Sequence, residues 1–161
     1  MMKRIIMTAA AFLLTAGSLP LALASGPGHE EHEHNFSAGE PGDPRAPSRT
    51  IQVTMQEGDG KMTFVPNHID ARLGEQIKFV LHNSGELDHE FVLATAEENK
   101  KHAKAMEMNP EMEHDDPNGR RVAPKKSDAI VWKFTKPGHF EYACLIPGHY
   151  EAGMFGTVDV K

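Results

Sequence analysis

The chain has 161 residues, a formal net charge of −6 at pH 7 and a single cysteine. This length leaves room for one domain with a proper hydrophobic core, but not for two. The acidic balance, without a basic patch, argues against nucleic acid as a partner, and one cysteine excludes an internal disulfide.

Residues 1–24 predict a secretory signal peptide. Lys3 and Arg4 precede an apolar run from Ile5 to Leu23, and the small residues around Ala24 form a cleavage site of the A-x-A kind. A membrane anchor is the alternative, but threonine, glycine, serine and proline interrupt the run and make it short for a stable span. Because the signal looks bacterial, we expect a mature protein in the periplasm, without a membrane span.

Residues 25–49 are rich in glycine, proline, glutamate and histidine and have no apolar periodicity, which predicts a disordered tail or linker. The sequence pattern changes at residue 50, where we place the start of the folded domain, residues 50–161. From there apolar residues alternate with polar ones, as in Ile51, Val53 and Met55, and turn residues separate short runs. Strands are predicted at 51–55, 62–65, 68–71, 75–82, 89–95, 128–134, 139–143 and 155–160. Seven or eight short strands indicate an all-β sandwich.

One segment departs from the strand pattern. Residues 96–108 contain good helix formers and no β-branched residue, so we predict a helix that ends before Pro110. Residues 111–124 are polar, and Pro117, Asn118 and Gly119 predict a turn. This is a short helical excursion between two strands rather than a second domain.

The loop from Tyr142 to Phe155 contains the only cysteine, Cys144, then His149 and Met154. A thiolate, an imidazole and a thioether form a soft donor set that suits copper rather than zinc, magnesium or iron. Two histidines and a cysteine in a plane, with a weak axial methionine, make a blue-copper electron-transfer site. The second histidine must come from elsewhere, and His89 is the best candidate because it stands at the end of a strongly hydrophobic segment.

Each of these residues also has an ordinary structural interpretation. A lone cysteine is more often a small buried hydrophobic residue than a ligand, and a lone methionine usually fills core. The combination favours the metal, since Pro147 and Gly148 force a tight turn just before His149.

This arrangement resembles the cupredoxin (type 1 blue-copper) family, which includes azurin and plastocyanin, over residues 51–161. The resemblance implies a Greek-key β-sandwich with the metal at one end, His89, Cys144, His149 and Met154 as copper ligands, and electron transfer through the exposed edge of His149. Four residues separate Cys144 from His149, as in azurin, whereas His149 and Met154 are one residue further apart than in azurin.

The residues next to the expected ligands differ from those of some cupredoxins and multicopper oxidases. Many relatives have asparagine after the first histidine, where this chain has Glu90; its backbone N–H could still donate to the cysteine sulfur, and Asn83 could tether the cysteine loop. Multicopper oxidases flank the copper cysteine with histidines, but here the neighbours are Ala143 and Leu145, and a binuclear electron-transfer centre needs a second cysteine. We therefore do not expect an enzyme.

Two further clusters are candidates for additional copper. The first is a histidine cluster in the acidic tail, which is as consistent with a solvated polar segment: His29, His32 and His34. The second stands in and after the predicted helix: His102, Met106, Met108, Met112 and His114. Methionines at helical spacing usually belong to a core, but their acidic surroundings are poor for burial and exposed thioethers favour Cu(I). His68, His82 and His139 are interpreted as structural or surface residues.

The combination of these clusters with a type 1 site looks like the copper-tolerance cupredoxins of the CopI type. The resulting hypothesis is a periplasmic copper-binding protein that acts in copper tolerance or homeostasis with one-electron Cu(I)/Cu(II) chemistry. The alternative is a diffusible electron carrier of the azurin or plastocyanin kind, exchanging electrons with an unidentified redox protein. A pure carrier has no need of the additional clusters, so the first hypothesis is preferred.

Overall fold

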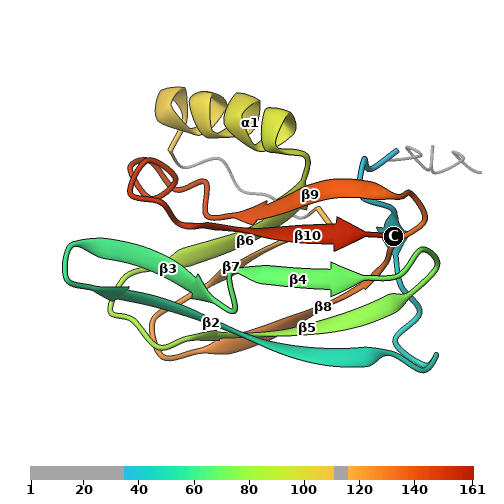
Figure 1. The fold of residues 1–161 in the computed structure, drawn as a ribbon. Helices are drawn as coiled ribbons and strands as arrows, with labels where there is room; N and C mark the ends of the chain where they lie inside the picture. Colours follow the sequence, from blue (N-terminus) through green and yellow to red (C-terminus); the bar gives the residue numbers. More distant parts are fainter. Residues whose placement is uncertain (1–34, 111–115) are drawn as a thin grey trace, which may run out of the picture. The chain divides into compact units, whose positions relative to one another are not determined.

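The computed structural model describes residues 35–110 and 116–161. Within this part of the chain, two five-stranded sheets face each other, with strand orders β1-β8-β5-β2-β3 and β4-β10-β9-β6-β7 (Figure 1). The strands are β1 (Glu40–Pro41), β2 (Arg49–Gly58), β3 (Lys61–Val65), β4 (His68–Ala71), β5 (Gln76–Asn83), β6 (His89–Ala94), β7 (Gly119–Val122), β8 (Ser127–Lys133), β9 (Gly138–Ala143) and β10 (Phe155–Val160). The predicted all-β sandwich is confirmed.

The core between the sheets is formed by side chains that face inward at every second position along the strands. In β5, Ile77, Phe79 and Leu81 are completely buried, and the residues between them face outward. Aromatic rings fill much of the space, and the Phe91 and Tyr142 rings stack 5.1 Å apart. The two sheets therefore share one continuous hydrophobic core.

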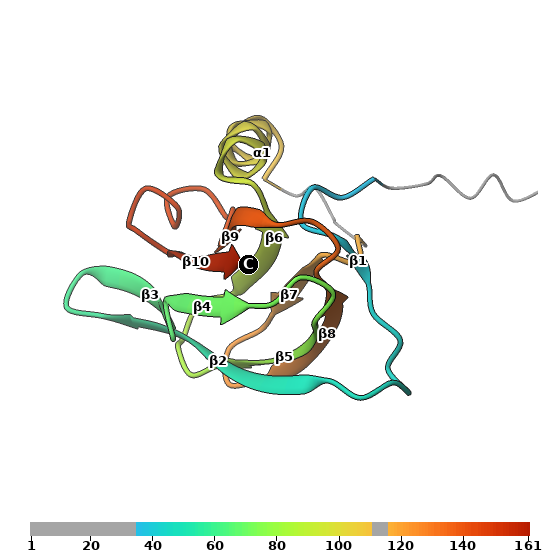
Figure 2. The ribbon, with the colours of Figure 1, turned by 45° about the vertical axis from the view of Figure 1, so that its right-hand side comes forward.

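Helix α1 (Ala96–Met108) has the predicted bounds and lies beside β9 and β6 (Figures 1 and 2). Its first turn is fixed by a capping box. The Thr95 hydroxyl accepts a hydrogen bond from the N–H of Glu98, and the Glu98 carboxylate accepts one from the N–H of Thr95. Met106 is completely buried against Val92 and Ala143 on the outer face of the sheet. Because the helix covers this face, β6 is buried on both sides and does not alternate.

Two strands were not predicted. β1 pairs with β8, the ring of Phe36 meets Trp132 edge-on, and Ala38 is completely buried. The prediction of a disordered segment over residues 25–49 was therefore wrong for 35–49, which pack on the sandwich through a few isolated contacts without any apolar period. β7 consists of Gly, Arg, Arg and Val, and joins the sheet through its backbone ladder with β6 rather than through an apolar face.

Several predictions lie outside the described residues. These are the signal peptide over 1–24 and the candidate copper ligands His29, His32, His34, Met112 and His114. In the part of the chain that the structure describes, no helix has the length and apolar character needed to cross a membrane.

Candidate metal centre

Three of the predicted ligands meet at one end of the sheet that contains β6 and β9. His89 is the first residue of β6, and Cys144 directly follows β9. The two strands are antiparallel, with Val92 opposite Ala143, so the start of β6 lies beside the loop that follows β9. The Nδ1 atom of His149 is 3.2 Å from Cys144 Sγ and 3.3 Å from His89 Nδ1, and Cys144 Sγ is 4.0 Å from His89 Nδ1.

The loop between β9 and β10 is closed by its own backbone hydrogen bonds. The N–H of His149 donates to the carbonyl of Ile146, and the N–H of Met154 donates to the carbonyl of His149, both at 3.0 Å. The N–H of Cys144 donates to the carbonyl of Met154, also at 3.0 Å, which joins the two ends of the loop. Gly148 has a φ of 87°, a left-handed conformation that explains the glycine before His149.

All four predicted ligands are shielded from solvent. The side chains of His89, Cys144 and Met154 are completely buried, and His149 is 8% exposed. Met154 belongs to the same hydrophobic cluster as Cys144. The sulfur and imidazole donors thus lie in an environment that excludes water, with His149 as the donor nearest to the surface.

The electrostatic surroundings leave the donors neutral in the absence of a metal. Burial raises the pKa of the Cys144 thiol to about 12, so a metal must displace its proton. Burial also lowers the pKa values of His89 and His149, so both imidazoles are unprotonated, and able to coordinate, at neutral pH. The backbone N–H of Glu90 donates to Cys144 Sγ at 3.2 Å. Glu90 thus makes the predicted backbone hydrogen bond to the sulfur, although many relatives have asparagine at this position.

Glu57, on β2 of the other sheet, is a site residue that sequence reasoning missed. Its Oε1 lies 3.3 Å from Nε2 of His89, the ring nitrogen that faces away from Cys144. The carboxylate accepts the backbone N–H groups of Leu87 at 2.7 Å and of Glu86 at 3.0 Å. Burial raises the pKa of Glu57, but these N–H groups and His89 together bring it below its ordinary value. No local sequence pattern identifies Glu57 as a site residue, because it comes close to His89 only through the position of β2 in the folded protein.

Gly85 makes this approach of Glu57 feasible. A Cβ atom at position 85 would lie 2.0 Å from Oε2 of Glu57, which is shorter than any real contact. Asn83 then fixes the same segment, because its Nδ2 donates to the carbonyls of Leu87 at 2.7 Å and of Val122 at 2.8 Å. Asn83 therefore holds the segment that leads to His89, rather than the cysteine loop that we had considered.

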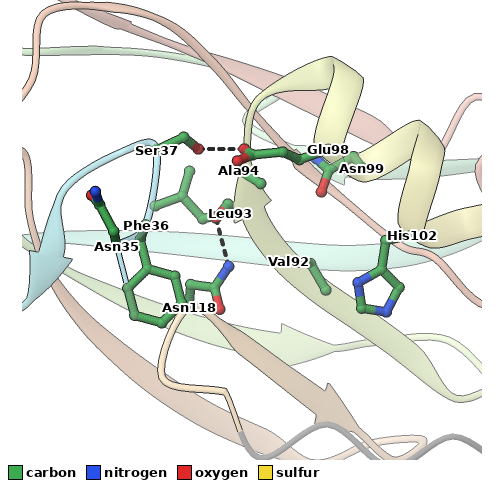
Figure 3. A pocket seen from close by; sticks show the side chains of 10 residues that line it. All are labelled: Asn35, Phe36, Ser37, Val92, Leu93, Ala94, Glu98, Asn99, His102 and Asn118. Carbon is green, nitrogen blue, oxygen red and sulfur yellow. Dashed lines mark hydrogen bonds between the residues drawn. The ribbon is translucent and has the colours of Figure 1, made fainter. Parts of the chain in front are cut away.

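The helical candidates for additional copper differ in their exposure to solvent. Met106 is completely buried in an apolar cluster, whereas Met108 is 79% exposed. His102 lines a cavity of about 190 Å³ together with Asn99 and Asn118 (Figure 3). His68, His82 and His139 are exposed, as expected.

The family of copper binding proteins described as plastocyanin/azurin matches residues 51–161. The copper-resistant cuproprotein CopI of Rubrivivax gelatinosus is 47% identical over 134 residues, which cover 83% of this chain and 79% of that protein. The protein of the same name from Pseudomonas aeruginosa is 36% identical over 157 residues, covering 80% and 84%. Among solved structures, auracyanin B superposes with a TM-score of 0.62 at 21% identity, covering 77% of this chain and 96% of its own, which is a likeness of fold.

The chain therefore belongs to the plastocyanin/azurin family of copper-binding proteins, and copper is its cofactor. The predicted resemblance to cupredoxins, and within them to the CopI type, is confirmed. The residues at the centre fit this metal, since a buried thiol, two neutral imidazoles and a buried thioether combine soft and borderline donors.

Proposed function

We propose that this protein is a periplasmic type 1 copper protein that acts in copper tolerance or homeostasis. His89, Cys144, His149 and Met154 would hold the copper, with the Met154 thioether as the weakest of the four donors. The observation that carries this assignment is the convergence of three buried donor atoms from β6 and the loop after β9, with Met154 buried in the same cluster.

The protein's part in the redox chemistry is to hold these donors still. A bound copper ion supplies one-electron exchange between Cu(I) and Cu(II). His89 begins a strand and Cys144 directly follows one, so both stand on rigid elements. The Glu90 N–H fixes the sulfur, and the loop hydrogen bonds fix His149 and Met154. Such a frame would hold the donors in place while the ion exchanges an electron.

The proposed role in tolerance is supported by the relatives named as copper-resistant cuproproteins. The histidine cluster in the predicted tail also favours it, since a protein that handles excess copper gains from further donors. The predicted signal peptide supports the periplasm as the compartment. The apolar neighbours of Cys144, Ala143 and Leu145, favour a role without catalysis, because they provide no ligands for a second copper centre.

A diffusible electron carrier is the second candidate, and one surface feature favours it. The Tyr150 and Phe155 rings, on the stretch of chain that contains His149 and Met154, lie 5.5 Å apart, and Phe155 is 42% exposed. A partly exposed aromatic pair on the stretch of chain that contains candidate ligands suits brief contact with a redox partner.

A comparison of growth and respiration separates the two roles. A strain that lacks this protein should grow poorly at raised copper while respiring normally without added copper. The Cys144→Ser variant should fail to restore copper tolerance, whereas wild type should restore it. A respiratory defect in unsupplemented medium, with unchanged copper tolerance, would identify the protein as an electron carrier instead.

The site assignment itself is tested by colour. The Cu(II) protein should show an intense visible band from thiolate-to-copper charge transfer, and Cys144→Ser should abolish it. His82→Ala, a substitution of an exposed histidine on β5, is the matched control and should leave the band unchanged. A Cu(II) complex without that band would contradict the assignment.

A further inference from the structure

A second group of potential ligands lies on the outer face of the sheet β4-β10-β9. β10 is parallel to β4, which places His68 opposite Thr157 and Asp70 opposite Asp159. β10 is antiparallel to β9, which places His139 on the other side of Asp159. Their neighbours Ile69, Val158 and Phe140 are buried in the core, so strand alternation turns the polar residues together toward solvent.

The donor atoms of this group are close enough to share one ion. One ligand atom each from His68, Asp70 and Asp159 lies within 4.8 Å of the others. Nε2 of His68 is 3.7 Å from Oδ2 of Asp70. Metal-to-ligand distances of about 2 Å place adjacent donors roughly 3 to 4 Å apart, so small rotations of exposed side chains complete such a site.

The strands also hold the side chains in suitable orientations. Nδ1 of His68 lies 2.9 Å from Oγ1 of Thr157, which fixes the ring and leaves Nε2 directed toward the carboxylates. Nδ1 of His139 lies 2.6 Å from Oδ1 of Asp159, which orients that carboxylate. The hydrogen bond from His139 lowers the pKa of Asp159, so this carboxylate is ionised at neutral pH.

We propose that His68, Asp70 and Asp159 form a second copper site on the surface, selective for Cu(II), with His139 as the residue that positions Asp159. Imidazole and carboxylate donors without sulfur favour Cu(II) over Cu(I), in contrast to the thiolate and thioether of the type 1 site. The site does not depend on the role proposed above, and it adds a function to His68 and His139, which are surface residues as expected.

The two sites lie toward opposite ends of the sheet. His139 and Cys144 are five residues apart along β9 and its continuation, which corresponds to roughly 17 Å at the rise of an extended strand. Helix α1 packs over the sheet near Ala143 and leaves the His139 end open to solvent. The amine of Lys161, 3.6 Å from Oδ1 of Asp70, is the cation that an incoming metal has to displace.

The test uses the full mature chain with His29, His32 and His34 replaced by alanine, so that the histidines of the tail do not compete. Its type 1 site is first filled until the thiolate band reaches full height, and Cu(II) is then added. The bound copper is counted by equilibrium dialysis, and its environment is read by electron paramagnetic resonance. We expect one further equivalent, with the wide hyperfine splitting of Cu(II) in a tetragonal field of nitrogen and oxygen donors.

His68→Ala and Asp159→Asn should each weaken this second equivalent at least about tenfold while leaving the thiolate band at full height, which shows that the fold is intact. His139→Ala should weaken it by about tenfold through loss of positioning, and Lys161→Ala should strengthen it. His82→Ala is the matched control, because Nδ1 of His82 also lies beside a hydroxyl, that of Ser127 at 3.0 Å, but on the other sheet. Absence of a second equivalent in the background chain, or its survival in both His68→Ala and Asp159→Asn, would overturn the proposal.

Discussion

At the scale of single residues, the two ring nitrogens of His89 have different partners. Nδ1 faces Cys144 and His149, and Nε2 faces the Glu57 carboxylate at 3.3 Å. A carboxylate behind a ligating histidine fixes the ring and increases its basicity. A negative charge at this position also stabilises Cu(II) relative to Cu(I), because the oxidised ion carries one more positive charge.

Replacing Glu57 with glutamine should therefore raise the reduction potential. The amide keeps an oxygen for the N–H groups of Leu87 and Glu86 but loses the charge. A tenfold change in the Cu(II)/Cu(I) equilibrium, about 59 mV for one electron, is the expected order, measured by redox titration of the visible band. Glu86→Gln is the matched control, because it removes an equal charge from a side chain that is 81% exposed and paired with Lys125. Equal shifts in both variants would show that only net charge matters.

The axial position is the second question at this scale, since Met154 stands one residue further from His149 than in azurin. A thioether is a weak, soft donor that favours Cu(I) relative to a harder oxygen ligand. Met154→Gln should lower the potential and shift the visible spectrum, and Met154→Leu should raise the potential. Leu and Gln are close to Met in volume, so the fold should survive both changes. A potential that stays the same in both variants would remove Met154 from the ligand set.

At the scale of elements, strands and helices with a clear local sequence pattern were predicted, whereas strands that depend on pairing with a distant strand were not. The strands with alternating apolar residues and the helix over residues 96–108 were predicted close to their bounds, because period and helix propensity act within a few residues. β1 and β7 were missed, since neither has an apolar period and each exists through pairing with a distant strand. Cys144, His149 and Met154 were predicted from their spacing on one loop, and His89 from its place at the end of a hydrophobic segment. Glu57 was not predicted, because it comes from the opposite sheet.

Helix α1 gives a prediction that tests its role as packing. Met106→Ala should lower the free energy of unfolding by about 2–4 kcal/mol, because it leaves a cavity between the helix and β6. Met108→Ala should change it by less than about 0.5 kcal/mol, since that side chain is 79% exposed. Urea unfolding of the two variants measures this difference. Comparable small effects in both would mean that the helix adds little to stability.

At the scale of the whole molecule, the candidate ligands connect segments that are distant in the sequence. His89 is contributed by β6, whereas Cys144, His149 and Met154 are contributed by the connection between β9 and β10. A metal bound by all of them joins these segments in the folded state only, because the unfolded chain does not hold the four donors together. The free energy of copper binding therefore adds to the free energy that stabilises the folded state.

Copper removal should accordingly lower the thermal stability of the whole domain. With free copper at about 1,000 times the dissociation constant, binding stabilises the folded state by about 4 kcal/mol. For a domain of this size that corresponds to a rise in Tm on the order of 15 °C, measured by calorimetry on the copper-loaded and metal-free protein. Cys144→Ser should lose most of this rise, because the thiolate is gone while the fold around it is kept. The triple variant His29→Ala, His32→Ala, His34→Ala should keep the rise in full, since those residues precede the sandwich. A copper-dependent rise of equal size in Cys144→Ser would show that the stabilising ion is bound elsewhere than at the centre built around Cys144.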